Sequence, residues 1–164
     1  MAYLVRNDPT DYHFSDFTVY IQSSGGVIAN TDSSYLFYMF SNLSSIEGLE
    51  HLDTSNVTNM SHMFDQDQPN YVTGALVELN VSSFDTSNVT NMSYMFRYCS
   101  SLTTLDLSNF DTNNVTEKYY MFGNMLDSAL VRVKDKTTQD WILALQNYYY
   151  LPSAWSTDNV IIKS

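Results

Sequence analysis

Two stretches of the chain place large apolar residues at the same spacing. Leu102, Leu105, Leu107 and Phe110 follow the pattern Leu-x-x-Leu-x-Leu-x-x-Phe, and the segment 76–84 repeats it with valine at the third apolar position. Alternate side chains of a β-strand point to the same face, so Leu105 and Leu107 predict a short strand with one buried face. We expect the segment 76–84 to contain an equivalent strand.

A different apolar spacing follows each of these strands. Val89, Met92, Met95 and Phe96 lie at positions i, i+3, i+6 and i+7, which is one stripe of a helix. The residues before them, 85–88, read Asp-Thr-Ser-Asn and favour turns and helix N-caps. Each unit is therefore predicted to be a strand, a turn and one or two helical or 3₁₀ turns.

This unit is repeated along the chain. The phrase FDTSNVTNMSYMF at 84–96 recurs almost unchanged at 52–64 and more loosely at 110–122, and a degenerate half copy, SSYLFYMF, ends at Phe40. Units that cannot bury their own apolar face stack on their neighbours. The sequence therefore predicts an α/β repeat fold, a short leucine-rich-repeat solenoid with parallel β-strands.

The spacing of the repeats is unequal. The Met-Phe pairs begin at Met39, Met63, Met95 and Met121, so the steps are 24, 32 and 26 residues. The long step contains an insertion, DQDQPNYVTG at 65–74, whose polar residues, proline and glycine predict a surface loop. Loops carry function more often than cores do, although a neutral insertion explains the same residues.

Residues 1–34 do not fit the repeat and are predicted to cap its first coil. The β-forming run 17–21 and the apolar run 27–29 flank the turn residues Ser-Ser-Gly-Gly at 23–26, which predicts a β-hairpin. Residues 3–5 could add a strand to it. A solenoid exposes apolar surface at its first coil, and this hairpin would cover that surface.

Residues 124–164 also leave the repeat and are predicted to close the other end. Trp141 and Trp155 are expected to pack over the last coil rather than to stack on a ligand. The three full repeats then occupy 35–123, and repeats and caps form one compact domain. The predicted elements of this β-α-β cap are a strand at 129–133, a helix from Thr137 or Thr138 through Asn147, and a strand at 159–162.

The charge of the chain excludes some classes of partner. The net charge is −11, so the phosphates of a nucleic acid or of an anionic membrane would be repelled. No apolar run is long enough to cross a bilayer, and the N-terminal residues lack the layout of a signal peptide. The one cysteine, Cys99, permits no internal disulfide and is predicted to be buried.

The run CSSLTTLDLSNFDTNNVT at 99–116, preceded by NMSYMF, resembles bacterial BspA-like leucine-rich repeat proteins. The resemblance covers residues 34–123, and the flanking segments also look like the ends of such arrays. It implies an extracellular location on a bacterial surface or, for related arrays, on a phage particle. It also implies adhesion to host matrix proteins, other cells or mucosal glycans. No catalytic residue is known for such repeats, so none is carried over.

The chain shows no pattern that is typical of an active site or a metal site. Its three histidines lack ligand spacing, it has no nucleophile elbow, and nothing in it suggests paired carboxylates across a cleft. Asp53, Asp85 and Asp111 recur at one position of the repeat, and one carboxylate per coil suits a turn cap better than a Ca²⁺ ligand. We therefore expect no enzymatic activity, no cofactor and no metal.

The chain has more tyrosines than a small core needs. Tyr94 takes the place of His62 in the preceding coil and Tyr120 follows it, so these rings could form a column on one face. Tyrosine is rigid and amphipathic and is enriched in binding surfaces, but the same rings could instead fill the edges of the core. The candidate binding residues are Tyr94, Tyr98, Tyr119, Tyr120, Tyr148 and Tyr149.

These observations favour a non-catalytic binding or adhesion module that recognises a host or bacterial protein or glycan at a cell surface. A structural or receptor-binding component of a phage particle is one alternative, and such a chain would form a homo-oligomer. Ice binding by a ladder of Thr58, Thr90 and Thr116 is another, although the unequal coil lengths argue against it. Neither nucleic acid binding nor membrane insertion is expected.

Overall fold

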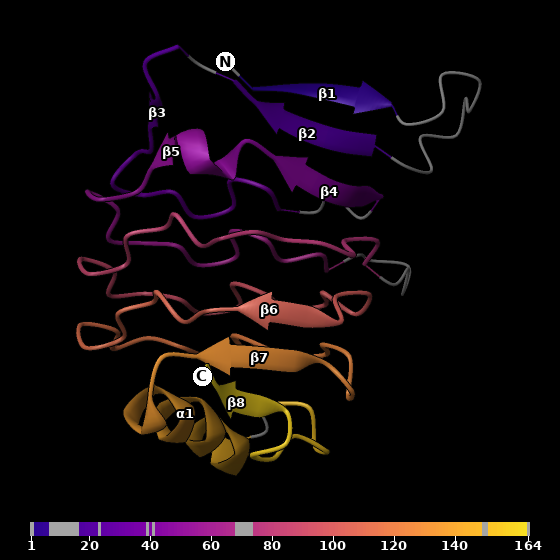
Figure 1. The fold of residues 1–164 in the computed structure, drawn as a ribbon, viewed down its shortest axis with the longest axis vertical. Coiled ribbons are helices and arrows are strands. Elements are labelled where there is room, and N and C mark those ends of the chain that lie inside the picture. The colour runs from indigo at the N-terminus through magenta and orange to yellow at the C-terminus, as the bar shows by residue number, and fades with distance from the viewer. Residues whose placement is uncertain are drawn as a thin grey trace.

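Successive segments of the chain lie side by side along the long axis of the molecule (Figure 1). The computed structural model describes residues 2–6, 17–22, 24–38, 40, 42–67, 74–148 and 151–163. Parallel bridges join Asp32 to Asn59, Asn59 to Asn91, and Asn91 to Glu117, at steps of 27, 32 and 26 residues. Each segment is therefore one coil of a stack, and equivalent residues of neighbouring coils lie next to one another.

The N-terminal end of the stack holds two small sheets. The strands of the first sheet are, in order, β1 (Ala2–Arg6), β2 (Phe17–Ile21) and β4 (Leu43–Glu47). β1 and β2 are antiparallel, whereas β2 and β4 are parallel. The second sheet pairs β3 (Val27–Ile28) in parallel with β5 (Leu52–Asp53), and the 3₁₀ helix η1 (Leu49–His51) precedes β5.

The predicted hairpin between 17–21 and 27–29 is wrong. The antiparallel partner of β2 is β1, whereas β3 pairs with β5 of the next coil. The Ala29 N–H accordingly donates to the Asp53 carbonyl at 2.9 Å. The bend at Gly26, where φ is 80°, turns the chain within one coil instead of folding it back on itself. From Phe17 onward the described residues therefore belong to the first coil, and β1 precedes that coil.

The half copy aligns three residues earlier than the Met-Phe spacing predicts. The Phe37 N–H donates to the Met63 carbonyl, and the Phe37 ring stacks on Phe64 at 5.4 Å with 7° between the planes. Phe37 is buried whereas Phe40 is only half-buried, so Phe37 is the equivalent of Phe64. Burial in the shared core thus sets the register, and Met39 lies outside the described residues.

The second half of each coil is a series of turns rather than a helix. The Met63 N–H donates to the Met60 carbonyl, an i to i+3 bond, but His62 between them has a left-handed φ of 56°. A residue in this conformation interrupts a helix. Other N–H groups bond to the next coil instead. The Met60 N–H, for example, donates to the Asn91 carbonyl at 2.9 Å. The apolar spacing that suggested a helix therefore belongs to a series of turns, whose backbone groups form hydrogen bonds between coils.

The first half of the coils matches the apolar pattern only in part. Leu105 and Leu107 are both buried, and Leu105 lies in β6 (Thr104–Asp106), as predicted. The segment 76–84 buries its leucines in the same way, but it is not a strand. One link to the preceding coil is the Val77 N–H, which donates to the Ser44 carbonyl at 3.1 Å.

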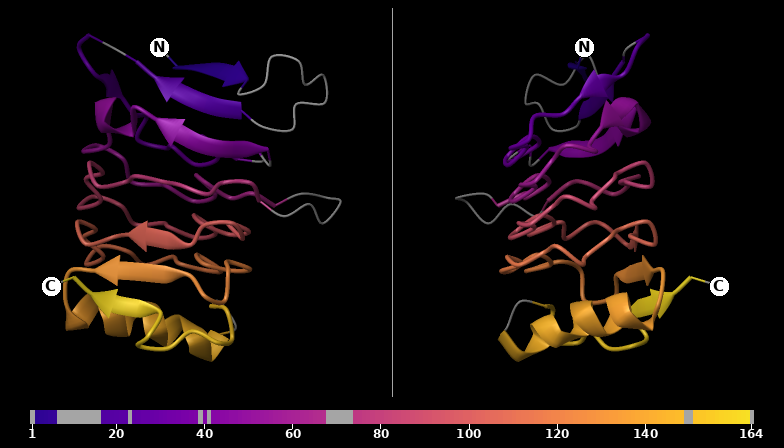
Figure 2. Two further views of the ribbon diagram at one scale, coloured as in Figure 1. Left: turned by 45° about the vertical axis from the view of Figure 1, so that its right-hand side comes forward. Right: turned by 90° about the vertical axis from the view of Figure 1, so that its left-hand side faces the viewer.

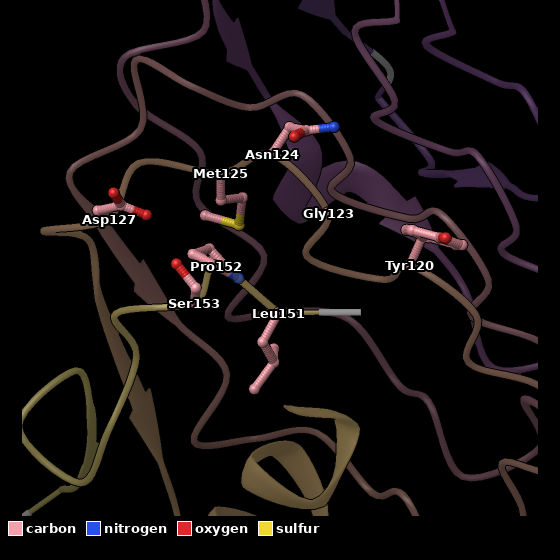
Figure 3. A pocket seen from close by; sticks show the side chains of 8 residues that line it. All are labelled: Tyr120, Gly123, Asn124, Met125, Asp127, Leu151, Pro152 and Ser153. Carbon is pink, nitrogen blue, oxygen red and sulfur yellow. The ribbon is translucent and has the colours of Figure 1, made fainter. Parts of the chain in front are cut away.

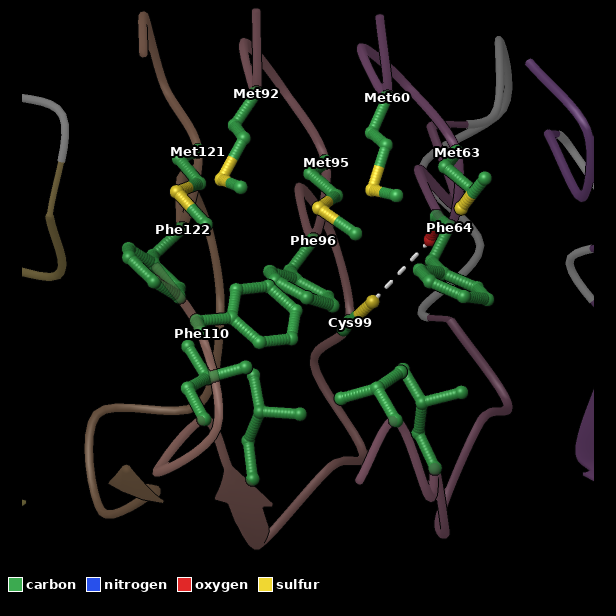
Figure 4. Packing of buried hydrophobic residues seen from close by; sticks show 14 of the residues in the cluster. Met60, Met63, Phe64, Met92, Met95, Phe96, Cys99, Phe110, Met121 and Phe122 are labelled. Atoms are coloured by element: carbon green, nitrogen blue, oxygen red, sulfur yellow. Dashed lines mark hydrogen bonds between the residues drawn. The ribbon is translucent and has the colours of Figure 1, made fainter. Parts of the chain in front are cut away.

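One apolar interior runs along the stack (Figure 4). Phe64, Phe96 and Phe122 of successive coils stack at 5.8 Å, with interplanar angles of 5° and 14°. Trp155 continues the row at 5.6 Å from Phe122, which agrees with its predicted place over the last coil. Cys99 is buried, as predicted; its thiol donates to the Phe64 carbonyl, and burial raises its pKa.

The two ends of the insertion are fixed to the core. Gln66 is buried, its Nε2 donates to the Phe40 carbonyl at 3.3 Å, and its Oε1 accepts from the Leu76 N–H at 3.2 Å. A Cβ at Gly74 would overlap the backbone carbonyl oxygen of Tyr98 as well as this Oε1, so the position requires glycine. Residues 68–73 of the predicted surface loop lie outside the described part of the chain. The insertion thus begins and ends at anchored positions.

The C-terminal segment continues the stack. Its strands pair in parallel in the order β6-β7-β8, and the helix between the last two lies at the end of the molecule (Figure 2). The N-cap predicted at Thr137 or Thr138 is wrong, because Asp135 caps the helix and its carboxylate accepts from the Thr138 N–H at 2.8 Å. The elements are β7 (Leu130–Val133), α1 (Lys136–Leu143), the 3₁₀ helix η2 (Ala144–Tyr148) and β8 (Val160–Ile162).

Candidate functional site

Four aromatic rings from four successive coils stack in one row, which we call the aromatic column. The ring centroids of Tyr35 and His62 are 4.5 Å apart, those of His62 and Tyr94 also 4.5 Å, and those of Tyr94 and Tyr120 5.7 Å. The angles between successive planes are 10°, 13° and 9°. Parallel stacks with such separations are favourable for aromatic pairs when the rings are offset. The column is therefore a rigid row of rings along the stack.

The backbone holds every ring of the column in the same way. Tyr35, His62, Tyr94 and Tyr120 have φ between 49° and 62°, the left-handed region. The N–H groups of the first three donate to a carbonyl of the next coil, as His62 does to Ser93 at 2.9 Å. Non-glycine residues rarely adopt this conformation, and it persists only where the surrounding structure imposes it. For these three residues the bonds between coils supply that constraint, and the shared φ gives all four the same backbone conformation.

A buried carboxylate lies beside the column. Asp65 is 0 % exposed, accepts a hydrogen bond from Nδ1 of His62 at 2.7 Å, and binds Arg97 of the next coil at 3.0 Å. A second acid, Asp67, contacts the same guanidinium at 2.6 Å. Buried charges are stable only when they are paired and hydrogen-bonded, and Asp65 meets both conditions. The network joins two coils at the base of the insertion.

Arg97 connects this network to the rings. Its guanidinium lies 4.7 Å from the centre of the Tyr94 ring and 5.4 Å from that of Tyr98, which are cation–π distances. Burial alone would lower the pKa of Arg97, but the hydrogen bonds and charge of Asp65, together with the charge of Asp67, raise it above its usual value. Arg97 thus remains charged and holds one side of the column.

The predicted binding residues are divided by the structure. Tyr94 and Tyr120 lie in the column and Tyr98 contacts Arg97, whereas Tyr119 is exposed and is not one of the four rings of the column. Only the backbone of Tyr148 is described, at the end of η2, and Tyr149 lies outside the described residues. The prediction omitted Tyr35, Asp65 and Arg97, and it named His62 only as the counterpart of Tyr94. Each ring of the column lies two residues before a buried phenylalanine of its coil. This constant spacing is the sequence signal that identifies Tyr35, which precedes Phe37.

The recurring aspartates cap turns. The carboxylates of Asp53, Asp85 and Asp111 each accept from the backbone N–H two residues later, at 2.9–3.0 Å. Hydrogen bonds from Ser55 and Ser87 lower the pKa of Asp53 and Asp85. Among the described residues, no group of three acids, histidines or cysteines could hold a metal ion. These carboxylates therefore have a structural explanation within the described coils.

The threonine ladder is a second exposed row. The hydroxyls of Thr58, Thr90 and Thr116 each donate to the carbonyl of the equivalent threonine in the preceding coil, at 3.1–3.3 Å. Each of these side chains is exposed. Substitutions in this ladder can therefore serve as controls for substitutions in the aromatic column, because both rows lie on the same coils.

Low pH is expected to destabilise the stack through its aspartates. Burial opposes ionisation of Asp106, but hydrogen bonds from Ser108 and contact with Lys163 lower its pKa to about 2. The unfolded state, in which aspartate has a pKa near ~4, then binds more protons than the folded state, so stability rises with pH in this window. The melting temperature should be level above about pH 5 and fall between about pH 4 and pH 2. Thermal melts across this range check it.

Asp106→Asn is the matched variant for this measurement. It should melt lower than the parent at neutral pH and lose less stability on acidification, because one of the shifted groups is gone. Identical pH profiles for the two proteins would contradict the assignment to Asp106.

One known family model matches the part of the chain that contains most of the coils. The model described as "Mycoplasma protein of unknown function, DUF285" matches residues 32–140. The matched region begins at Asp32, the first residue of the coil-to-coil bridges, and ends inside α1. No curated protein and no solved structure matches the chain. None of the helices in the described residues has the length and hydropathy needed to cross a bilayer.

Proposed function

We propose that this chain, which belongs to the DUF285 family of proteins of unknown function, is a non-catalytic binding module of the BspA-like leucine-rich-repeat type. In this proposal the stacked coils are a short solenoid, and one exposed face of it contacts a protein or glycan at a cell surface. The aromatic column is the observation that carries the proposal.

The column has the physical properties of a binding surface. Tyr35 and Tyr120, at its two ends, are 50 % and 40 % exposed, although the column is stacked and fixed to the backbone. Because stacking covers the ring faces between neighbours, the edges are the parts left for a partner. Side chains that are ordered before binding lose little entropy when a partner arrives, and tyrosine is enriched at interface hot spots. A core-filling role alone would not require this exposure.

The charges near the column indicate the kind of partner. Arg97 is neutralised by Asp65 and Asp67, and the whole chain carries a net charge of −11. An anionic polymer would find no unpaired cation among these residues. The proposed partner is therefore a neutral glycan or a protein surface that offers hydrogen-bond donors, apolar groups or positive charge.

A paired set of variants tests this proposal. Tyr35→Asn with Tyr94→Asn removes two rings, and asparagine tolerates the left-handed conformation at both sites. Thr58→Ala with Thr90→Ala is the matched control on the threonine ladder of the same coils. Binding to glycan arrays and to host or bacterial surface extracts is measured for parent, test and control proteins after circular dichroism shows that all three are folded.

We expect the parent and the control to capture the same partners and the tyrosine variant to bind at least about tenfold more weakly, which is the scale of one lost hot spot. Equal binding by the tyrosine variant would exclude the column as the contact surface. If the folded parent captures no partner in either assay, the binding function itself is contradicted.

A further inference from the structure

A cavity of about 260 Å³ lies at the C-terminal end of the aromatic column (Figure 3). Tyr120, the last ring of the column, lines it on one side. Asn124 and Asp127 follow on the same coil, and Leu151, Pro152 and Ser153 contribute the wall from the C-terminal segment. The cavity thus combines one aromatic ring, an apolar wall and three polar side chains.

One sequence difference beside the ring is relevant to this end of the column. Arg97 is three residues after Tyr94, and its guanidinium lies over the Tyr94 ring at 4.7 Å. Gly123 occupies the equivalent position, three residues after Tyr120, and lines the cavity. Even a Cβ at Gly123 would lie 3.2 Å from Cδ1 of Tyr120, tighter than an ordinary contact. The Tyr120 side chain thus packs closely against the glycine, whereas the residue at the equivalent position of the preceding coil places a guanidinium over the Tyr94 ring.

The polar lining selects a type of ligand. Asn124 offers an amide donor and acceptor, Asp127 a carboxylate and Ser153 a hydroxyl. No hydrogen bond within the described residues engages these three side chains. The described lining has no lysine, arginine or histidine, so a phosphate, sulfate or carboxylate would meet Asp127 without a compensating cation.

We propose that this cavity binds one neutral sugar residue, with a face of the sugar ring against Tyr120 and its hydroxyls bonded to Asn124, Asp127 and Ser153. This deepens the proposed binding function and rests on it, because the sugar would be a terminal residue of the recognised glycan. The volume fits a single ring, since sites for drug-sized ligands are usually ~300–1,000 Å³. The longer glycan would extend along the edges of the aromatic column.

Saturation-transfer NMR and titration calorimetry test the proposal on the full chain. The probes are the methyl glycosides of glucose, galactose, mannose and N-acetylglucosamine, with sialic acid as the anionic comparison. At least one neutral glycoside should bind with a dissociation constant on the order of 1 mM, as expected for a small ligand, and sialic acid should not bind. Absence of binding by all four neutral probes overturns the proposal, and so does preferred binding of sialic acid.

Three variants locate the bound sugar. Tyr120→Asn removes the ring and should weaken binding about tenfold, the scale of one aromatic contact. Asp127→Ala, at an exposed position with little risk to folding, should also weaken it severalfold. Thr116→Ala, on the threonine ladder of the same coil, is the control, because its exposed side chain does not line the cavity. If the control loses as much affinity as the two cavity variants, the site is elsewhere.

The two proposals fail differently. If the neutral glycosides do not bind but the Tyr35 and Tyr94 variant still loses a surface partner, the cavity assignment is wrong and the binding module stands. If the glycosides bind and the cavity variants weaken them while the column variant binds normally, the cavity is the site and the column is not.

Discussion

Leu105→Asp is expected to unfold the stack. Leu105 is 1 % exposed, lies in β6, and belongs to the apolar interior that adjacent coils share. The change removes a large buried side chain and places a carboxylate among apolar neighbours. We expect a loss of about 5 kcal/mol or more, comparable with the ~5–15 kcal/mol that stabilises a typical domain. Chemical denaturation followed by circular dichroism measures it.

Thr104→Asp is the control for this experiment. Thr104 precedes Leu105 in the same strand but is exposed, so the same carboxylate would meet water. Its effect should stay within about 0.5–1 kcal/mol, which is usual for surface changes. If both variants lose the same stability, the cause is charge in this strand rather than burial, and the inward orientation of Leu105 is contradicted.

Gly48→Ala is expected to have the second largest effect. Gly48 has φ of 84° and lies between β4 and η1, against the backbone of β2. A Cβ there would overlap the Ile21 carbonyl oxygen and lie 3.0 Å from its carbon, so the strand itself would have to move. The left-handed conformation alone costs ~1–2 kcal/mol for alanine, and the displaced strand should bring the loss to about 3 kcal/mol or more.

Gly25→Ala separates this clash from the general effect of replacing glycine. A Cβ at Gly25 meets nothing within 4 Å. Alanine there should leave the melting temperature unchanged or raise it slightly, because it restricts the unfolded chain. If the Gly48→Ala protein has the same melting temperature as the Gly25→Ala protein, Gly48 does not lie as close to the Ile21 backbone as described.

The parts of the fold that depend on strictly periodic residues could be predicted from the sequence. Leu105 and Leu107 share a buried side because alternate strand residues must do so, and Cys99 is buried because it occupies an apolar position of the repeat. The alignment of His62 with Tyr94 and Tyr120 follows from their equal offsets within the repeated phrase. Periodicity therefore indicates which residues meet between coils.

The remaining features depend on contacts that have no local signal. The first coil was missed because Phe17–Ile21 and Val27–Ile28 suit a hairpin as well as two parallel pairings, and the choice is made by the coil that follows. The helical stripe was misjudged because the left-handed conformation of His62 is imposed by the hydrogen bond to Ser93.

The ion pairs beside the column illustrate the same limit. Asp65 and Arg97 are 32 residues apart in sequence, and each occurs at its position of the repeat in one coil only. The repeat spacing does place the two residues at equivalent positions, three after His62 and three after Tyr94. No recurring pattern singles them out as an ion pair, however, because opposite charges meet at this position in only one pair of neighbouring coils.

The anchoring of the insertion by Gln66 and Gly74 has a consequence for variation. Gln66 bonds to the backbone of Phe40 and Leu76, and a Cβ at Gly74 would overlap the backbone carbonyl oxygen of Tyr98, so a substitution at either anchor would disturb neighbouring coils together. Variation at these two positions is therefore expected to be far more restricted than the polar composition of the insertion suggests.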